Sequence, residues 1–336
     1  MRKPLPIGVE NFREIIEKQY YYVDKTLLIK DLIDLRSKVN LFTRPRRFGK
    51  TLNMSMLRYF FEKNDGSRNP FAGTKIMGAG ERYISEMGRY PVISISMKSM
   101  KQADYKSAFY CLKEEMAREF KRHSDLIDVL DSAEEKEKFN RFIDRTADPE
   151  EYLTALQFLS ECMKNECGTG AVILIDEYDV PLENAFFNGF YREMVSLVRS
   201  LFESALKTND ALEFAVVTGC LRISKESIFT GLNNLAIISI LDSSYAEHFG
   251  FTQEEVDQML AYYGLEDKRE TVRQWYDGYR FGQTEVYNPW SLINYVNSFY
   301  KNDNALPRPY WSNTSSNSIV RTLVDRADLS VKQEIE

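Results

Sequence analysis

Apolar residues concentrate in five short segments of the chain, and each segment predicts a β-strand. The segments are residues 39–42, 91–97, 171–175, 214–219 and 235–241. Residues 171–175 are apolar without interruption, which is typical of a strand that is buried on both faces of a parallel sheet. Because helical patterns separate the five segments, we expect an α/β fold with a mainly parallel five-stranded sheet flanked by helices.

Two helices are predicted beside the first strand, from apolar side chains that recur at helical spacing. An entry helix before the strand is predicted from Leu27, Leu28, Ile29, Leu32 and Ile33, and a second helix after it from Leu52, Met56, Leu57, Phe60 and Phe61. From about residue 103 to 165 the chain is rich in charge, and there we expect solvated helices that cover the sheet.

The pattern changes beyond residue 241, where signals for helix starts dominate. A capping box opens at Thr252, and Asn288 precedes a proline at the first helical position. We therefore divide the chain into a domain of residues 1–245 and a smaller, mainly helical lid or linker domain of residues 246–336. Residues 275–282 form an aromatic-rich turn, for which packing between the two domains is the favoured role.

Composition and charge narrow the class of protein. The 336 residues carry a formal net charge of −6, which argues against a coat of positive potential but leaves a local basic groove open, so nucleic-acid binding is not evident. The four cysteines lack C-x-x-C spacing, and two histidines are too few for a Cys/His zinc site. Scattered thiols predict a reducing, cytoplasmic location, and no apolar window is long enough to predict a membrane span.

Residues 44–51 read Arg-Pro-Arg-Arg-Phe-Gly-Lys-Thr and lie between the first predicted strand and the next helix. In a phosphate loop, backbone N–H groups face the phosphates, the lysine contacts the outer phosphates and the hydroxyl binds Mg²⁺. Gly49, Lys50 and Thr51 match those roles. Arg44 stands where the general pattern has glycine, and a surface loop that starts a helix is the alternative. The strand before the loop, the helix after it and an acidic pair downstream favour the phosphate loop.

Arg46, Arg47 and Phe48 complete the predicted nucleotide-binding residues of the loop. Guanidinium groups suit phosphate oxygens because their N–H donors form a fork. Among Arg44, Arg46 and Arg47 we expect one or two to contact nucleotide and the others to be solvated.

Asp176 and Glu177 directly follow the buried strand of residues 171–175. Asp176 is predicted to hold Mg²⁺ through water, together with Thr51, and Glu177 to act as the general base that polarises the attacking water. An acidic pair that only ends a strand is the alternative. Asp179 could support the metal shell or cap a turn before Pro181, and we favour the cap.

Thr218 and Arg222 follow the next buried strand. Thr218 is a candidate hydrogen-bond donor to the γ-phosphate or the lytic water, and a threonine that merely ends a strand fits equally well. Arg222 is a candidate for stabilising charge in the transition state, either within its own chain or across a subunit interface. A surface salt bridge is an equal alternative for Arg222.

Five short motifs carry a family resemblance. They are residues 22–26 (Tyr-Val-Asp-Lys-Thr), the phosphate loop 44–51, residues 174–179 (Leu-Ile-Asp-Glu-Tyr-Asp), residues 218–223 (Thr-Gly-Cys-Leu-Arg-Ile) and residues 275–279 (Trp-Tyr-Asp-Gly-Tyr). Together they resemble the AAA-ATPase-like family of anaerobic gut bacteria over nearly the whole chain, and arginine also stands at the position of Arg44 in that family. The resemblance implies a P-loop NTPase that binds ATP and Mg²⁺.

The same resemblance implies two further features. Family members commonly continue into a PD-(D/E)XK nuclease-like domain, for which this chain stops too early. Asp24 and Lys25 stand where related ATPases contact the adenine side of the nucleotide, although an entry helix capped at Asp24 explains the same residues.

These residues lead to one predicted function and two alternatives. The chain is predicted to hydrolyse ATP to ADP and phosphate and to control an appended or partner module. The first alternative is a nucleotide-gated switch with little turnover, in which nucleotide orders the C-terminal domain. The second is the ATPase component of a nuclease-containing defence or mobile-element system, which rests on family analogy alone. A homo-oligomer and a nuclease-like partner stay open.

Overall fold

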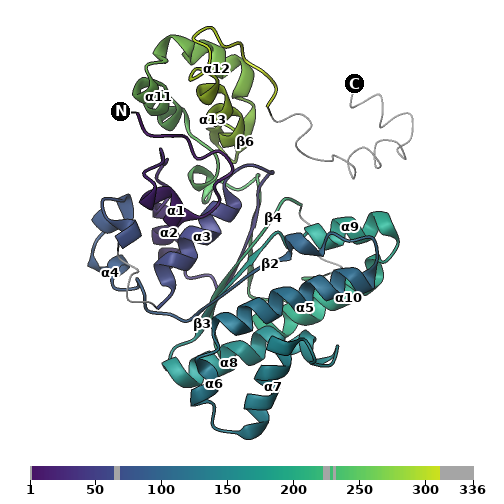
Figure 1. The fold of residues 1–336 in the computed structure, drawn as a ribbon. Coiled ribbons are helices and arrows are strands. Elements are labelled where there is room, and N and C mark those ends of the chain that lie inside the picture. The colour runs from purple at the N-terminus through teal and green to yellow at the C-terminus, as the bar shows by residue number, and fades with distance from the viewer. Residues whose placement is uncertain (1, 64–68, 222–227, 230–231, 311–336) are drawn as a thin grey trace.

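The structure is a computed structural model that describes residues 2–63, 69–221, 228–229 and 232–310. Within these residues, five parallel strands form the central sheet (Figure 1). The strands are β1 (Val39–Thr43), β2 (Val92–Ser96), β3 (Ala171–Asp176), β4 (Leu212–Gly219) and β5 (Leu235–Ile238), in the order β2-β3-β4-β1-β5. The predicted five-stranded parallel sheet is confirmed. The fifth strand ends at Ile238 rather than 241, because Ser239 begins a turn in which its N–H donates to Asp242.

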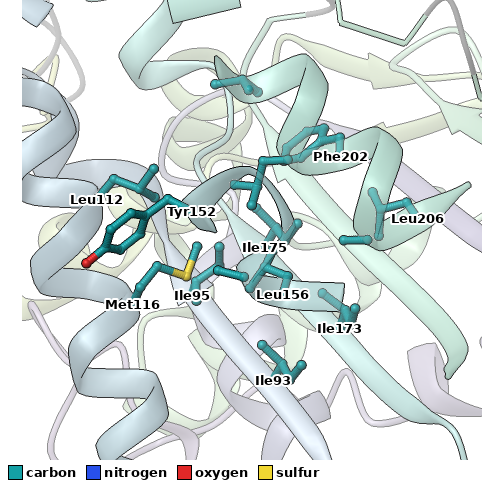
Figure 2. Close-up of a cluster of buried hydrophobic side chains, with 14 of the residues drawn as sticks. Ile93, Ile95, Leu112, Met116, Tyr152, Leu156, Ile173, Ile175, Phe202 and Leu206 are labelled. Carbon is teal, nitrogen blue, oxygen red and sulfur yellow. The ribbon is translucent and has the colours of Figure 1, made fainter. Parts of the chain in front are cut away.

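Each face of the sheet packs against its own hydrophobic cluster. Along β3, Ile173 and Ile175 belong to one cluster, and Val172 and Leu174 belong to the other, as expected when successive side chains point to opposite faces. Figure 2 shows the first cluster, in which the two isoleucines lie near Leu156. All six residues of β3 are buried, and the apolar run of residues 171–175 predicts this for the first five.

Helices cover both faces of the sheet (Figure 1). The second cluster is covered by α1 (Phe12–Glu17), α2 (Leu27–Leu35), α3 (Lys50–Phe61) and α4 (Glu81–Ile84). The first cluster is covered by α5 (Tyr105–Arg122), α6 (Leu126–Val129), α7 (Ala133–Asp144), α8 (Ala155–Cys167), α9 (Val180–Asn188) and α10 (Tyr191–Leu206). The predicted entry helix corresponds to α2, and the predicted helix after the first strand corresponds to α3.

Helix α5 corrects the expectation that the charged region 103–165 consists simply of solvated helices. Its face with Leu112, Met116 and Phe120 is buried in the first cluster. Some of its charges are used on the edge strand β2: Glu119 accepts the N–H of Ser94 at 2.7 Å, Glu115 that of Ser96 at 2.9 Å, and Arg122 donates to the carbonyl of Val92 at 2.6 Å. These side chains cover an edge that would otherwise expose unpaired backbone groups.

The C-terminal unit contains α11 (Gln253–Tyr263), α12 (Arg269–Tyr276), α13 (Pro289–Ser298) and a hairpin of β6 (Tyr279–Phe281) and β7 (Thr284–Val286). The capping box predicted at Thr252 is present, and Asn288 caps α13 through the N–H of Ser291. The predicted aromatic turn therefore contains a strand of this hairpin. Within the described ranges, no helix combines the length and apolarity that a membrane span needs.

The first residues of the chain pack with this C-terminal unit. Leu5 is part of its hydrophobic cluster, and Tyr21 and Val23 pack against the cluster. The backbone of Lys3 also accepts a hydrogen bond from Tyr263 at 2.8 Å and donates one to Tyr262 at 3.0 Å. The N-terminal segment thus runs from the C-terminal unit to the face of the sheet that α1 and α2 cover, and this places it beside the phosphate loop.

Candidate functional site

The phosphate loop leaves the sheet after Thr43 and ends where α3 begins. Gly49 precedes the helix with φ 81° and ψ 15°, a left-handed backbone conformation that favours glycine. No side chain caps α3, and Gly49, Lys50 and Thr51 line a cavity. The start of this helix therefore presents backbone N–H donors suited to an anion.

Asp176 is the point at which three of the predicted residues meet. Its Oδ2 accepts a hydrogen bond from the Thr51 hydroxyl at 2.7 Å, and its Oδ1 accepts one from the Thr218 hydroxyl. The carboxylate is 5% exposed. One carboxylate and two hydroxyls are hard oxygen ligands, which suit Mg²⁺ when substrate phosphates and water complete its coordination.

Among the described residues there is no group of three or more histidines, cysteines, aspartates and glutamates that could hold a metal ion. A single carboxylate with two hydroxyls, as found at Asp176, suits a metal that protein and phosphate bind jointly, as is usual for Mg²⁺.

Lys50 is almost fully buried under the phosphate loop. Its Nζ donates to the carbonyls of Arg44 and Pro45, each at 2.9 Å, and contacts the Sγ of Cys220 at 3.3 Å. Cys220 lies in the segment after β4, so the lysine touches both sides of the site. Burial raises the pKa of the Cys220 thiol, although Lys50 acts in the opposite direction.

Glu177 lines the cavity directly after β3. Its backbone is left-handed, with φ 56°, a conformation that costs a non-glycine residue about 1 kcal/mol. Burial raises the pKa of its carboxyl, the negative charge of Asp176 adds to that effect, and Lys98 and Lys50 oppose it. A carboxylate with a raised pKa is a better proton acceptor, as a general base requires.

Asp179 does not cap the turn before Pro181, so that expectation is wrong. Helix α9 starts at Val180 with no hydrogen bond from the Asp179 side chain. The carboxylate reaches the segment after β4 instead, where its Oδ2 accepts the N–H groups of Cys220 and Leu221 at 2.8 Å each. The residue is 1% exposed, and burial raises the pKa of its carboxyl.

Arg44 corrects the expectation that the arginines of the loop are either bound to nucleotide or solvated. It is fully buried, and its guanidinium lies 4.7 Å from the ring centre of Phe281 and 5.4 Å from that of Phe249. It also donates to the carbonyl of Ile238 at 3.3 Å. Burial lowers the pKa of Arg44 to about 10. The arginine fills the space between the loop, the end of β5 and the hairpin, where glycine would leave a void.

Arg46 and Arg47 both line the cavity but have different partners. Arg46 forms an ion pair with Glu183 at 2.9 Å. Arg47 has φ 71°, and its guanidinium lies 4.2 Å from the ring centre of Trp290 at the start of α13. A guanidinium over an indole face is an attractive cation–π arrangement. Arg47 therefore connects the phosphate loop to the C-terminal unit.

The Phe48 ring is 1% exposed and packs against the hairpin, with ring centres 4.8 Å from Tyr279 and 5.3 Å from Phe281. Its position also requires glycine at residue 250, because a Cβ there would lie 2.9 Å from the Phe48 ring. The aromatic segment 275–282 thus packs on the loop, as the favoured interpretation predicts. The role of Phe48 in nucleotide binding stays a prediction.

The cavity has a volume of about 430 Å³, and two chemically different groups of residues line it. One group is the phosphate loop with Glu177. The other consists of apolar and aromatic side chains from the N-terminal segment and the C-terminal unit, among them Tyr21, Val23, Met259 and Ile293. Such a site suits a ligand with one anionic and one flat apolar part.

Charge in the cavity differs in sign from charge in the whole chain. Six cations line it, Lys25, Arg46, Arg47, Lys50, Lys98 and Lys101, against three carboxylates, Glu10, Glu177 and Glu183. The lining therefore carries an excess of three positive charges, whereas the chain carries a formal net charge of −6. Such a local concentration of positive charge attracts an anionic ligand.

Asp24 and Lys25 have different surroundings. The Asp24 carboxylate accepts from the N–H of Thr26 at 2.8 Å and from the N–H of Lys75 at 2.7 Å, and it is not among the cavity-lining residues. The N-cap of α2 is Thr26, two residues after Asp24. Lys25 lines the cavity and forms a buried ion pair with Glu255 of α11. Nucleotide binding by Asp24 stays a prediction.

Several residues of the cavity were not predicted from the sequence. Lys98 and Lys101 follow the edge strand β2, and Trp290 comes from α13. The alternation of residues 91–97 predicted the strand whose end carries these lysines, but nothing in that pattern marked the lysines themselves. Arg222, the predicted transition-state residue, lies outside the described residues.

Two comparisons with known proteins agree with this geometry. A family model described as "Predicted AAA-ATPase" matches residues 6–229. A curated relative, "Uncharacterized protein in vnfD 5'region" from Azotobacter chroococcum mcd 1, is 32% identical over 323 residues. The match covers 94% of this chain and 55% of the relative, so the chain spans about half the length of the curated relative it matches.

Proposed function

Because this chain belongs to the family described as predicted AAA-ATPase, we propose that it binds ATP in the cavity at the phosphate loop and hydrolyses it to ADP and phosphate with Mg²⁺. The observation that carries this proposal is the meeting of Thr51 and Thr218 on the carboxylate of Asp176, beside the buried Lys50. These groups come from α3, β3 and β4, and they meet because the carboxyl ends of parallel strands lie at one edge of the sheet.

At the phosphate loop, the N–H groups of α3 and the ammonium of Lys50 are the proposed ligands of the outer phosphates. Thr51 and Asp176 are the residues that would hold Mg²⁺, which when bound neutralises charge on the phosphates. The excess of three positive charges in the cavity lining supports an anionic ligand. Glu177 is the proposed acceptor of the proton from the attacking water.

The apolar group of lining residues favours adenine over guanine. Guanine presents N–H donors on its Watson–Crick edge that a carboxylate would satisfy, and leaving such donors buried without a partner is unfavourable. The carboxylates that line the cavity are Glu10, Glu177 and Glu183, two of which lie on the side of the phosphate loop. The proposed base position is the slot near Tyr21, Met259 and Ile293.

The test of hydrolysis is phosphate release by the unmodified protein and by Glu177→Gln. Since general-base catalysis contributes about 10²- to 10⁴-fold, we expect Glu177→Gln to lower turnover at least about 100-fold while it retains ATP binding. The control is Glu161→Gln, which changes an exposed residue on α8 and should release phosphate at the same rate as the unmodified protein. Equal phosphate release by the unmodified protein and Glu177→Gln, with Mg²⁺ and any required partner present, would exclude the enzymatic function.

The contacts between the phosphate loop and the C-terminal unit favour a nucleotide-gated switch as the second candidate. Arg47 stacks on Trp290, and Lys25 pairs with Glu255, so two cavity residues hold this unit. A ligand that changes either contact would shift the position of α11 and α13. Limited proteolysis beyond residue 250 should then differ between the ATP and ADP states, and identical digestion patterns in the two states would remove the switch.

The role of the whole protein is also a proposal. The curated relative is longer than the matched region, which supports an ATPase that controls an appended or partner module. Cytoplasmic residence is supported by the four cysteines, which all lack disulfide partners. Comparing phosphate release by this chain alone and with a co-expressed partner would test the control of a module.

A further inference from the structure

Asp179 is the third acid in the segment Asp176-Glu177-Tyr178-Asp179, and the proposed reaction assigns it no role. The residue is 1% exposed, and removing a carboxylate from water is costly unless its oxygens are hydrogen-bonded. Its Oδ2 accepts two hydrogen bonds, from the backbone N–H groups of Cys220 and Leu221 in the segment after β4. Its Oδ1 is also buried and accepts no hydrogen bond from the described residues. Burying a polar oxygen in this way is costly, which calls for a reason.

Tyr178 holds the same segment from the other side. Its hydroxyl donates to the carbonyl of Leu221 at 2.6 Å, and its backbone N–H donates to the carbonyl of Thr218 at 3.1 Å. The ring lies so close to Gly219 that a Cβ at residue 219 would be 2.5 Å from it. Residues 218–221 are therefore clamped at four backbone positions by two consecutive residues of the turn after β3. We call this arrangement the 178–179 clamp.

The clamped segment contacts two residues of the proposed ATP site, the metal-binding Asp176 and the phosphate-binding Lys50. At its start the Thr218 hydroxyl donates to Asp176, and in its middle Cys220 contacts the Nζ of Lys50 at 3.3 Å. Glu177, the proposed base, lies between Asp176 and the clamp in a left-handed backbone conformation. A strained conformation of this kind persists only when its surroundings enforce it. The clamp supplies that constraint immediately after Glu177.

We propose that Asp179 is a positioning residue of the ATP site: through the N–H groups of Cys220 and Leu221 it fixes the turn that carries Glu177 relative to the segment that contacts Lys50 and Asp176. This inference rests on the proposed hydrolysis of ATP. Asp179 is 1% exposed, and its Oδ2 accepts two backbone N–H groups, so it acts through these neighbours and does not touch the nucleotide. Its loss should therefore impair turnover more than binding.

The kinetic test compares Asp179→Ala with Asp179→Asn, since asparagine keeps an oxygen that can accept the two N–H groups. We expect Asp179→Ala to lower kcat at least about 30-fold and Asp179→Asn about three- to tenfold, with the Kd for ATP within about threefold of the unmodified protein. Glu119→Gln is the matched control, because Glu119 is also a buried carboxylate that accepts a backbone N–H, yet it lies at the β2 edge. Its kcat should be unchanged.

A second measurement reads the clamp without hydrolysis. N-ethylmaleimide labelling of Cys220 is measured by mass spectrometry relative to the labelling of Cys111 in the same molecules. The relative rate should be at least about fivefold higher in Asp179→Ala than in the unmodified protein, because opening this segment exposes a half-buried thiol. Tyr178→Phe, which removes the hydroxyl that donates to Leu221, should give a smaller increase and serves if Asp179→Ala does not fold. Glu119→Gln should leave the ratio unchanged.

The outcomes separate this inference from the proposed function. Unchanged kcat in Asp179→Ala, or loss of ATP binding as large as that in Lys50→Ala, would overturn the positioning role. Unchanged labelling of Cys220 in both Asp179→Ala and Tyr178→Phe would overturn the clamp itself. If the unmodified protein releases no more phosphate than Glu177→Gln, the proposed hydrolysis fails, and the labelling ratio still decides whether the clamp holds residues 218–221.

Discussion

The β2 edge of the sheet and the carboxyl ends of β3 and β4 both carry charged side chains that are shielded from solvent. At the β2 edge, Glu119 accepts a backbone N–H and pairs with Arg122, which also donates to a backbone carbonyl. At the strand ends, the side chain of Glu177 makes no hydrogen bond or ion pair within the described part of the chain, and it lines a cavity. The charges at the β2 edge are directed at neighbouring backbone groups and maintain the fold, whereas the Glu177 carboxylate faces a cavity with bonding capacity left and is available to a ligand.

The largest effect of a substitution is expected from Glu119→Ala at the β2 edge. The substitution leaves the N–H of Ser94 without its acceptor and removes one of the two carboxylates that pair with Arg122, which keeps Glu62. We therefore expect a loss of about 3 kcal/mol in the free energy of unfolding. Urea denaturation measures it, and Glu161→Ala on the exposed face of α8 is the control. A loss below about 1 kcal/mol, or a change in ATP affinity, would contradict a purely structural role for the β2 edge.

The two regions should also respond to pH with opposite signs. Burial alone would raise the pKa of Glu119, but His123 and Arg122 outweigh it and hold the pKa at about 2, below the ordinary 4.5. Its stabilisation is complete above about pH 4.5 and is lost as pH falls toward 2. Burial raises the pKa values of the Glu177 and Asp179 carboxyl groups, so the folded protein holds these protons more tightly than the unfolded chain does. Their contribution to stability therefore decreases as the pH rises above the ordinary pKa values of these groups.

Unfolding free energies measured across pH test this contrast. Glu119→Gln should reduce the dependence of the unfolding free energy on pH between about pH 2 and 4.5. Asp179→Asn should leave this acid region unchanged and should reduce the loss of stability as the pH rises above it. The same change of slope in both variants would show that the two regions do not differ in this respect.

Thr218→Val is expected to have an intermediate effect. Valine keeps the shape of the side chain but removes the hydroxyl that donates to Asp176, a hydrogen bond to a charged group worth about 1.5–3 kcal/mol. The Mg²⁺ concentration that supports half-maximal phosphate release should rise about tenfold, which corresponds to about 1.4 kcal/mol. The control is Thr154→Val, at an exposed position before α8, which should leave the Mg²⁺ dependence unchanged. An unchanged Mg²⁺ dependence in Thr218→Val would show that Thr218 only ends its strand.

The smallest effect is expected from Trp290→Leu, which removes the aromatic face on which Arg47 lies. Since cation–π contacts contribute about 0.5–1 kcal/mol where they are accessible to solvent, ATP affinity should fall about two- to fivefold. Trp275→Leu is the matched control, because Trp275 is 51% exposed and does not line the cavity. Equal changes in the two variants would show that the contact between the phosphate loop and α13 does not contribute to binding.

Much of the sheet could be predicted because strands buried on both faces leave continuous apolar runs, as in residues 171–175. The same logic placed Lys50, Thr51, Asp176 and Thr218 near one another, since each follows or ends a predicted strand. Helix α5 was only partly predicted. Its charges suggested exposure to solvent, but Glu119 and Arg122 act on the backbone of β2, which no local pattern records.

The contacts with the C-terminal unit could not be predicted from local patterns. Arg47 lies on Trp290, and Lys25 pairs with Glu255, so both contacts join residues that are far apart in the sequence. They depend on how the C-terminal unit packs beside the phosphate loop, and spacing along the chain does not encode that arrangement. For the same reason the burial of Arg44 by the hairpin of β6 and β7 was not predicted, since each arginine of the loop was expected either to contact nucleotide or to be solvated.

The most direct test of the account is a calorimetric titration of the protein with ATP in the presence of Mg²⁺, comparing the unmodified chain with Lys50→Ala. We expect one saturable site in the unmodified chain and affinity on the order of 100-fold weaker in Lys50→Ala, because the variant loses the charge-assisted contacts of a buried ammonium. Lys164→Ala, which changes a partly exposed lysine bonded to the carbonyl of Asp210, should bind like the unmodified chain. Equal affinities in the unmodified chain and Lys50→Ala, or no binding by the unmodified chain, would contradict the assignment of this cavity to ATP.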